Sequence, residues 1–326
     1  MSISPATISI VPEGVLAYGI QLPVQALSVR TALEWEREGG TIADMVRVAQ
    51  ACDDAGFLYV AVCHHVAVPS GPAEMMGTQW FDPVPTLGYL AAHTTKTRLM
   101  TNVYVVAYQH PLQTAKAFMT IDALSGGRVI LGVGAGHVEG EFDALGVPFA
   151  ERGAITDEAI DAIDVALRDE YPQHAGARWR YADVGQAPRP VQQPRPPIWI
   201  GGSGKPALRR VAARGDGWIP QGTPRKQLPA EIAYIREHRD NVRPGAVPEI
   251  GYITEYVYVG EPEWEIPKYS VSGAPQKLID SFNELGAIGV SHLQLRFAAR
   301  SASEQCDQIA AFGADVGPHL TRVAFD

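Results

Sequence analysis

Three histidines are the side chains of this sequence best placed to move a proton. His64 and His65 follow the apolar run 57–62, and His137 follows a glycine-rich turn. Histidine titrates near neutral pH, so each of the three can act as an acid or a base, or can bind a ligand. Barrel hydrolases bind metal through a His-x-His spacing and a late aspartate, which this sequence lacks. We therefore predict no metal site, and the alternative is that the histidines are bonded into the rim of the fold.

Two glycine-rich turns could bring the backbone close to a ligand, since glycine has no Cβ in the way. The second turn precedes a predicted helix, whose N-terminal N–H groups and dipole favour an anion such as phosphate. The alternative is a tight turn in which Ser203 caps the helix. The residues predicted to bind the ligand are Gly134, Ala135 and Gly136 in the first turn and Gly201, Gly202, Ser203, Gly204 and Lys205 in the second.

The sequence contains no recognisable nucleophile. It has no GxSxG elbow and no HExxH motif, and its cysteines, Cys52, Cys63 and Cys306, have no evident activating partner. A site with glycine turns and histidines but no nucleophile is typical of redox chemistry performed by a cofactor.

The elements that must position these residues alternate along the whole chain. Strands are predicted at 16–22, 57–62, 98–106, 128–133, 197–200, 217–220, 249–259 and 290–297, with a helix after each. Eight such units predict one (β/α)8 TIM barrel domain over residues 1–326, in preference to two Rossmann-like halves. Residues 171–196 are rich in Pro, Gly and Arg and predict a surface excursion with a short hairpin near 179–181. In a barrel the site lies at the C-terminal ends of the strands.

Composition narrows the possible partners and surroundings. The 326 residues carry a net charge of −9, so nucleic acid is not an expected partner. Three scattered cysteines suit a reducing compartment, and the start of the chain shows no signal peptide pattern. No segment is apolar enough to cross a membrane, so we expect a cytoplasmic protein.

Several blocks of the sequence together resemble a known family. They are 18–23, 49–57, 64–66, 94–101, 110–111, 124–128, 131–136, 142–152, 197–204 and 215–218. With these blocks the chain resembles the luciferase-like monooxygenase superfamily, and within it the oxidoreductases that depend on the deazaflavin coenzyme F-420.

The resemblance implies a barrel that holds a flavin or deazaflavin at its mouth. It implies a non-prolyl cis peptide, by position Asn102–Val103, under the cofactor ring. The phosphate tail is expected on Gly201–Lys205, with Ala135 and Gly136 lining the entrance. A homodimer is also typical of the family.

The same resemblance assigns the three histidines by position. His65 matches a histidine of the active-site rim. His64 stands where many relatives have a carboxylate, so the role of that carboxylate does not carry over. His137 stands where sugar-phosphate dehydrogenases of the family place a glutamate, which argues against that activity.

These observations predict an F-420-dependent oxidoreductase that exchanges hydride with a small, hydrophobic organic substrate. His65, with His64 or His137 as alternatives, is expected to donate or accept the proton. The segments 66–82, 137–152 and 260–273 are expected to set the substrate. Three alternatives stay open: an FMN-dependent monooxygenase with a separate reductase, a metal-dependent hydrolase using His64 and His65, and a cofactor-binding barrel without turnover.

Overall fold

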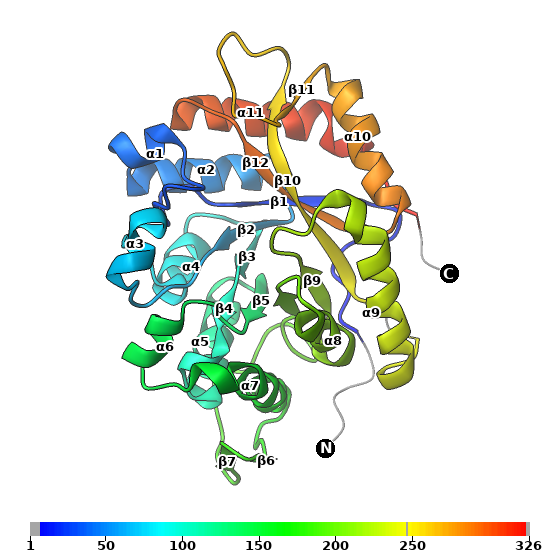
Figure 1. The fold of residues 1–326 in the computed structure, drawn as a ribbon. Helices are drawn as coiled ribbons and strands as arrows, with labels where there is room; N and C mark the ends of the chain where they lie inside the picture. The colour runs from blue at the N-terminus through cyan, green and yellow to red at the C-terminus, as the bar shows by residue number, and fades with distance from the viewer. Residues whose placement is uncertain (1–6, 246, 324–326) are drawn as a thin grey trace.

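The computed structural model, which describes residues 7–245 and 247–323, contains a closed barrel of eight parallel strands (Figure 1). The barrel strands are β1 (Ala17–Gln21), β2 (Tyr59–Val62), β3 (Arg98–Thr101), β5 (Val129–Gly134), β8 (Ile198–Gly201), β9 (Gly217–Ile219), β10 (Glu249–Val259) and β12 (His292–Phe297). The barrel closes where β12 pairs with both β10 and β1. The predicted (β/α)8 fold is confirmed.

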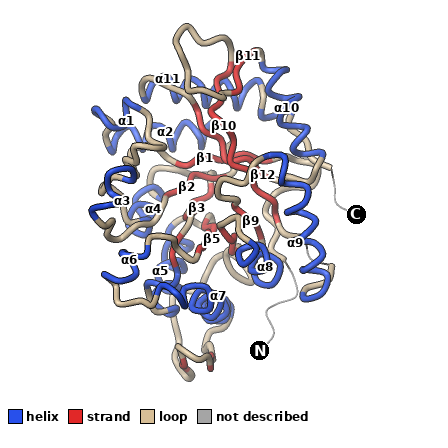
Figure 2. Tube along the Cα trace, in the orientation of Figure 1, coloured by secondary structure: helices blue, strands red, loops and turns tan. Residues whose placement is uncertain are grey.

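A helix follows each barrel strand and covers the outside of the barrel (Figure 2). The helices are α2 (Ile42–Asp54), α4 (Pro83–Ala91), α5 (Pro111–Leu124), α7 (Arg152–Arg168), α8 (Lys205–Arg214), α9 (Leu228–Val242), α10 (Pro275–Ala287) and α11 (Ala302–Asp315). Local signals define several starts: Thr41 and Asp44 form a capping box on α2, and Asp82 accepts from Val84 N at the start of α4.

The structure also contains elements that the sequence did not predict. They are the short helices α1 (Glu34–Gly39), α3 (Ser70–Met76) and α6 (Glu139–Ala144) and the short strands β4 (Tyr104–Val105) and β11 (Val271–Gly273). Each is too brief for hydrophobic periodicity to reveal. The prediction of one strand over 98–106 is wrong, because β3 ends at Thr101 and a cis bond separates it from β4.

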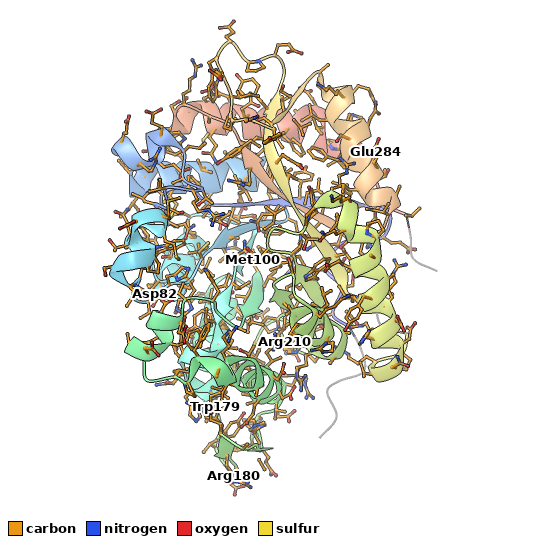
Figure 3. The ribbon with its side chains drawn as sticks, viewed as in Figure 1. Asp82, Met100, Trp179, Arg180, Arg210 and Glu284 are labelled. Atoms are coloured by element: carbon orange, nitrogen blue, oxygen red, sulfur yellow. The ribbon has the colours of Figure 1, made fainter. Side chains whose placement is uncertain are left out.

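Large side chains fill the inside of the barrel, and glycines on neighbouring strands make room for them. Tyr59, Ala61, Met100, Ile130, Trp199 and Ile219 form a buried cluster separate from the larger core. Met100 lies among the strands near the centre of the molecule (Figure 3). A Cβ on Gly19 would collide with the Tyr59 ring, and one on Gly217 would collide with Trp199. The barrel is therefore a packed core, and any site must lie at an end.

The predicted excursion near the middle of the chain is present. It holds the antiparallel pair β6 (His174–Ala175) and β7 (Arg180–Tyr181), which projects away from the barrel in Figure 1. Asp122 accepts from the backbone N–H groups of Val191 and Gln192, which ties the returning segment to α5. The excursion also packs on the outside of the barrel helices, since the Tyr181 hydroxyl donates to Ala162 O of α7 and Gln186 Nε2 donates to Leu112 O of α5.

Candidate functional site

The predicted site residues follow four strands whose C-terminal ends share one rim of the barrel, called the mouth from here on. They are His64 and His65 after β2, Asn102 and Val103 after β3, Gly134, Ala135, Gly136 and His137 at the end of β5, and Gly201, Gly202, Ser203, Gly204 and Lys205 at the end of β8. Direct contacts join several of them, and these contacts define what the mouth can do.

A backbone segment folded into the mouth joins three of the four groups. The Asn102–Val103 bond is cis, as the resemblance implied. The Val103 side chain lies against Gly134 and Gly201: a Cβ on Gly134 would stand 2.5 Å from Val103 Cγ2, and one on Gly201 would overlap Cγ1. These glycines are needed for close packing on Val103. Their contact with a ligand stays a prediction.

Asn102 holds this segment in place across the mouth. Its Nδ2 donates to Gln294 Oε1 of β12 at 2.8 Å, and its Oδ1 accepts from Gln221 Nε2 at 3.1 Å. The side chain is buried, so these bonds satisfy groups that water does not reach. Asn102 is therefore a structural anchor that connects β3 with β12 and with the loop after β9.

His65 forms a hydrogen-bonded pair at the mouth with Glu141 of α6. Its Nδ1 lies 2.9 Å from Glu141 Oε2, and Glu141 is fully buried. The edge of the Trp80 ring packs on His65, with ring centres 4.4 Å apart. The His65 ring is thus fixed both by its hydrogen bond and by an aromatic neighbour.

Glu141 accepts three further hydrogen bonds. Oε1 accepts from the backbone N–H groups of Val66 and Ala67, and Oε2 accepts from the Tyr108 hydroxyl at 3.1 Å. Burial by itself would raise the pKa of Glu141, but the hydrogen bonds from His65, Val66 and Ala67 lower it to about 2.

The ionised state of Glu141 determines which nitrogen of His65 carries a proton. A carboxylate can only accept, so Nδ1 of His65 must donate to it. The Nε2 atom is then the one that can exchange a proton with a ligand. This is the arrangement of a general acid or base oriented by a buried carboxylate.

Glu141 is the functional residue that the sequence analysis missed. It lies one position before the block 142–152 that carries part of the family resemblance. Its contact with His65 spans 76 positions, and no spacing motif links the two residues. The one available signal was an acidic residue next to a family-specific block.

His64 lies behind the mouth, packed between the barrel and α5. Its ring stacks on Tyr104, with centres 4.4 Å apart, and Tyr104 in turn packs on Phe118 of α5. Its Nδ1 accepts from the backbone N–H of Val105 at 3.1 Å. Burial lowers the pKa of His64 to about 4, so the ring is neutral at pH 7. His64 thus holds the backbone segment 104–105, which follows the cis bond, in place.

Replacing His64 by phenylalanine is expected to destabilise the protein by about 2 kcal/mol at pH 7, because Val105 N–H loses its acceptor. The pKa of His64 is lowered on folding from 6.5 to about 4, so its contribution is full above pH 6.5 and falls toward pH 4. Urea unfolding should therefore show the cost of H64F shrinking by about 2 kcal/mol between pH 7 and 5. Equal costs at both pH values would contradict this; His319→Phe, at an exposed position, is the control.

His137 is the exposed histidine of the mouth. Its ring centre lies 5.7 Å from that of His65. Desolvation at the rim and the neighbouring His65 lower the pKa of His137, which favours its neutral form. Its proposed part in proton transfer stays a prediction.

The turn from Gly201 to Lys205 presents backbone groups in place of side chains. Ser203 Oγ already accepts from Gln221 N and Thr223 Oγ1, and Lys205 Nζ lies 3.6 Å from the centre of the Tyr234 ring. Gly204, not Ser203, is the N-cap of α8. Within the described part of the chain, the structure gives no acceptor for the N–H groups of Ser203, Gly204 and Lys205. Three successive free N–H groups suit an anion.

Two further observations concern the ligand classes considered for this fold. Across residues 7–245 and 247–323, His, Cys, Asp and Glu side chains form no group of three that could hold a metal ion. None of the helices in these ranges combines the length and apolar character that crossing a bilayer requires.

A closed (β/α)8 barrel that carries a histidine oriented by a buried carboxylate at its mouth is the architecture of a barrel enzyme with its site at the C-terminal ends of the strands. The chain belongs to the luciferase-like monooxygenase family, whose model matches residues 25–305. It is accordingly an oxidoreductase.

Individual relatives are similar to this chain in sequence or in fold. An uncharacterised protein of Mycobacterium tuberculosis, Rv0940c, is 30% identical over 207 residues, which cover 60% of this chain and 71% of the relative. The monooxygenase RslO1 of Streptomyces bottropensis shares 22% identity, with a TM-score of 0.78, over 93% of this chain and 99% of its own. The F-420-dependent tetrahydromethanopterin reductase of Methanopyrus kandleri shares 18%, with a TM-score of 0.73, over 94% and 99%.

Proposed function

We propose that this chain is an F-420-dependent oxidoreductase that exchanges hydride between the deazaflavin and a small, hydrophobic organic substrate. The observation that carries the proposal is the His65–Glu141 pair at the mouth, 2.9 Å apart, on a barrel of a family with redox cofactors. Hydride transfer to a carbon–oxygen or carbon–carbon double bond needs a proton from an acid, and the reverse step, hydride loss from the reduced carbon, needs a base to take that proton. We assign this proton to His65.

The residues of the mouth fit a tricyclic cofactor with a phosphate tail. Val103, carried inward between Gly134 and Gly201, offers an apolar surface for one ring face. The N–H groups of Ser203, Gly204 and Lys205 would bind the phosphate. When bound, the deazaflavin supplies a hydride acceptor or donor at C5, and the protein supplies orientation and the proton.

The proton path depends on Glu141. Its hydrogen bond to Nδ1 of His65 fixes the imidazole ring and leaves Nε2 for the ligand. Trp80 packs on the same ring and restricts it from one side. Met75 and Met76 lie on the same segment, 66–82, and support an apolar substrate.

Cofactor titration tests the proposal directly. We expect F-420 to quench the tryptophan fluorescence of the purified protein with saturation, because Trp80 lies beside His65 at the mouth. Saturable quenching by FMN with no response to F-420 would overturn the F-420 assignment.

Replacing His65 by glutamine is expected to lower the rate of F-420 turnover about 100-fold, because the proton donor is lost. The affinity for F-420 should change little, since glutamine removes no surface that the cofactor covers. Stopped-flow absorbance of reduced F-420 with a panel of small ketones and enones measures the rate. His319→Gln, at an exposed position after α11, is the matched control, and an unchanged rate in H65Q would remove the assigned proton donor.

A second candidate is an FMN-dependent monooxygenase supplied by a separate reductase. Similarity to known structures favours it: besides RslO1, a type II Baeyer–Villiger monooxygenase component of Pseudomonas putida, solved with FMN, has a TM-score of 0.73 at 13% identity over 96% of this chain and 100% of its own. The apolar surface of Val103 and the N–H groups of the turn 203–205 would bind FMN in the same way. The fluorescence titration above separates the two candidates.

The homodimer and the cytoplasmic location stay predictions from the family resemblance and the composition. The hydrolase that would use His64 and His65 and the barrel without turnover are not retained, because the family is one of oxidoreductases. Stoichiometric zinc that is lost with His64→Ala would support the hydrolase.

A further inference from the structure

Arg296 is a positive charge at the mouth for which the proposed function gives no role. The inward side of β12 is marked by His292, whose ring stacks on Trp199 inside the barrel, and by Gln294, which bonds to Asn102. Successive side chains of a strand alternate, so Arg296, two positions further, points to the same side. It therefore lies two residues closer than Gln294 to the C-terminal end of β12, at the mouth of the barrel.

Arg296 has an aromatic support but no acidic partner. Its guanidinium carbon lies 4.3 Å from the centre of the Tyr256 ring, and Nη2 donates to the Tyr256 hydroxyl at 2.9 Å. Among the described residues, no carboxylate forms an ion pair with it. Burial raises the pKa of Glu36, and the positive charge of Arg296 partly opposes this rise. The Glu36 oxygens already accept hydrogen bonds from Val24 N and Leu33 N.

A half-buried arginine with one hydrogen bond keeps most of its donors available. The guanidinium has five N–H groups in a planar fork, which matches a carboxylate with two parallel bonds. The stacking on Tyr256 fixes the plane of that fork. A guanidinium that is held on an aromatic ring and keeps most of its donors available has the geometry of an anion-binding group.

The position of Arg296 separates it from the phosphate turn. Around the barrel, β12 lies beside β1, which lies beside β2, whereas β10 and β9 intervene between β12 and β8. Arg296 is thus nearer to the strand that precedes His65 than to the turn at Gly201–Lys205. A group held by Arg296 would face the proton-handling side of the mouth.

We propose that Arg296 binds an anionic group of the substrate, and that the substrate is an organic carboxylate with an apolar body. The proposal rests on the proposed function, because it places this substrate in the same mouth. Tyr256 and Trp80 provide apolar surface beside the two polar groups that would orient the substrate, Arg296 and His65. The substrate is then hydrophobic at its reacting part and charged at one end.

Calorimetric titration of the purified chain with benzoate and with the neutral benzamide at pH 7 tests the proposal. We expect benzoate to bind at least tenfold more tightly than benzamide, because only the carboxylate can form two parallel charge-assisted hydrogen bonds with the guanidinium. Arg296→Gln should abolish this preference, and Arg296→Lys should keep part of it. Arg47→Gln, at an arginine that is 53% exposed on α2, is the control and should behave as the wild type.

Three results would overturn the proposal: no benzoate binding, equal affinities for benzoate and benzamide, or a preference that survives in R296Q. Titration of R296Q with inorganic phosphate, F-420 and FMN distinguishes the substrate from the cofactor as the source of the anion. If R296Q loses affinity for phosphate or cofactor but keeps the benzoate preference, Arg296 serves the cofactor. Because the benzoate titration needs no cofactor, failure of F-420 to bind would contradict the proposed function separately.

Discussion

Replacing Glu141 by glutamine is expected to destabilise the protein by about 3 kcal/mol at pH 7, because buried donors that bond to a charged acceptor lose it. Glutamine keeps the shape of the side chain but has one acceptor oxygen in place of two. One Glu141 oxygen accepts from Val66 and Ala67, and the other from His65 and Tyr108. In either orientation of the amide, its NH2 group faces donors.

The pH dependence gives this prediction a distinct signature. The pKa of Glu141 is lowered on folding from 4.5 to about 2, so its stabilisation is present above pH 4.5 and is lost as the pH falls toward 2. The cost of E141Q should thus be constant between pH 7 and 5.5 and smaller by about 1 kcal/mol at pH 4. This window lies below the one expected for His64, so the two variants are distinguishable.

Urea unfolding followed by far-ultraviolet circular dichroism at pH 7, 5.5 and 4 measures the effect. Glu139→Gln, an exposed position on the same helix α6, is the matched control and should cost less than about 0.5 kcal/mol. A cost for E141Q no greater than the control would mean that the buried cluster contributes little stability. The variant should also slow turnover about 100-fold, since His65 loses the carboxylate that orients its ring.

Much of the fold was readable from the sequence because each of the eight units repeats the same two signals. A short apolar run and an amphipathic stretch recur from 16–22 to 303–316, and seven of the eight strands fall where they were predicted. The exception is 98–106, where an apolar run continues through a cis bond. Hydrophobicity is the same on both sides of that bond, so pattern alone could not show the break.

The site was only partly readable, for a different reason. The residues that follow strands were found, since the carboxyl ends of barrel strands share one rim. Glu141 and Arg296 were not assigned, because their roles come from contacts with His65 and Tyr256 that span 76 and 40 positions. The role of His64 also changed, since only the structure shows which side of the barrel its ring occupies.

Replacing Gly201 by alanine is expected to destabilise the protein by about 2 kcal/mol, because the new methyl group would overlap Val103 Cγ1. The sequence alone favoured ligand approach as the reason for this glycine. The structure shows a nearer reason: Val103 occupies the space that a Cβ would need. Gly134 faces the other methyl group of the same side chain.

A double substitution separates the collision with Val103 from any other cost of replacing Gly201. In Gly201→Ala combined with Val103→Ala, both Cγ atoms are removed and the atom that remains, Val103 Cβ, lies 3.5 Å from the new Cβ. The combined destabilisation should then be smaller than the sum of the single costs by about 1–2 kcal/mol. Gly88→Ala, in α4 with no atom within 4 Å of the added Cβ, should be neutral or stabilising by up to about 1 kcal/mol.

The same variants test whether Val103 forms the apolar surface on which the cofactor ring rests. In G201A, Val103 must move from its place between β5 and β8, so F-420 affinity should fall about tenfold, a change of about 1.4 kcal/mol. In the double variant the collision is absent but the apolar surface is reduced, so affinity should stay low. If affinity recovered in the double variant, Val103 would be a packing residue only, and the ring would have to rest on another part of the mouth.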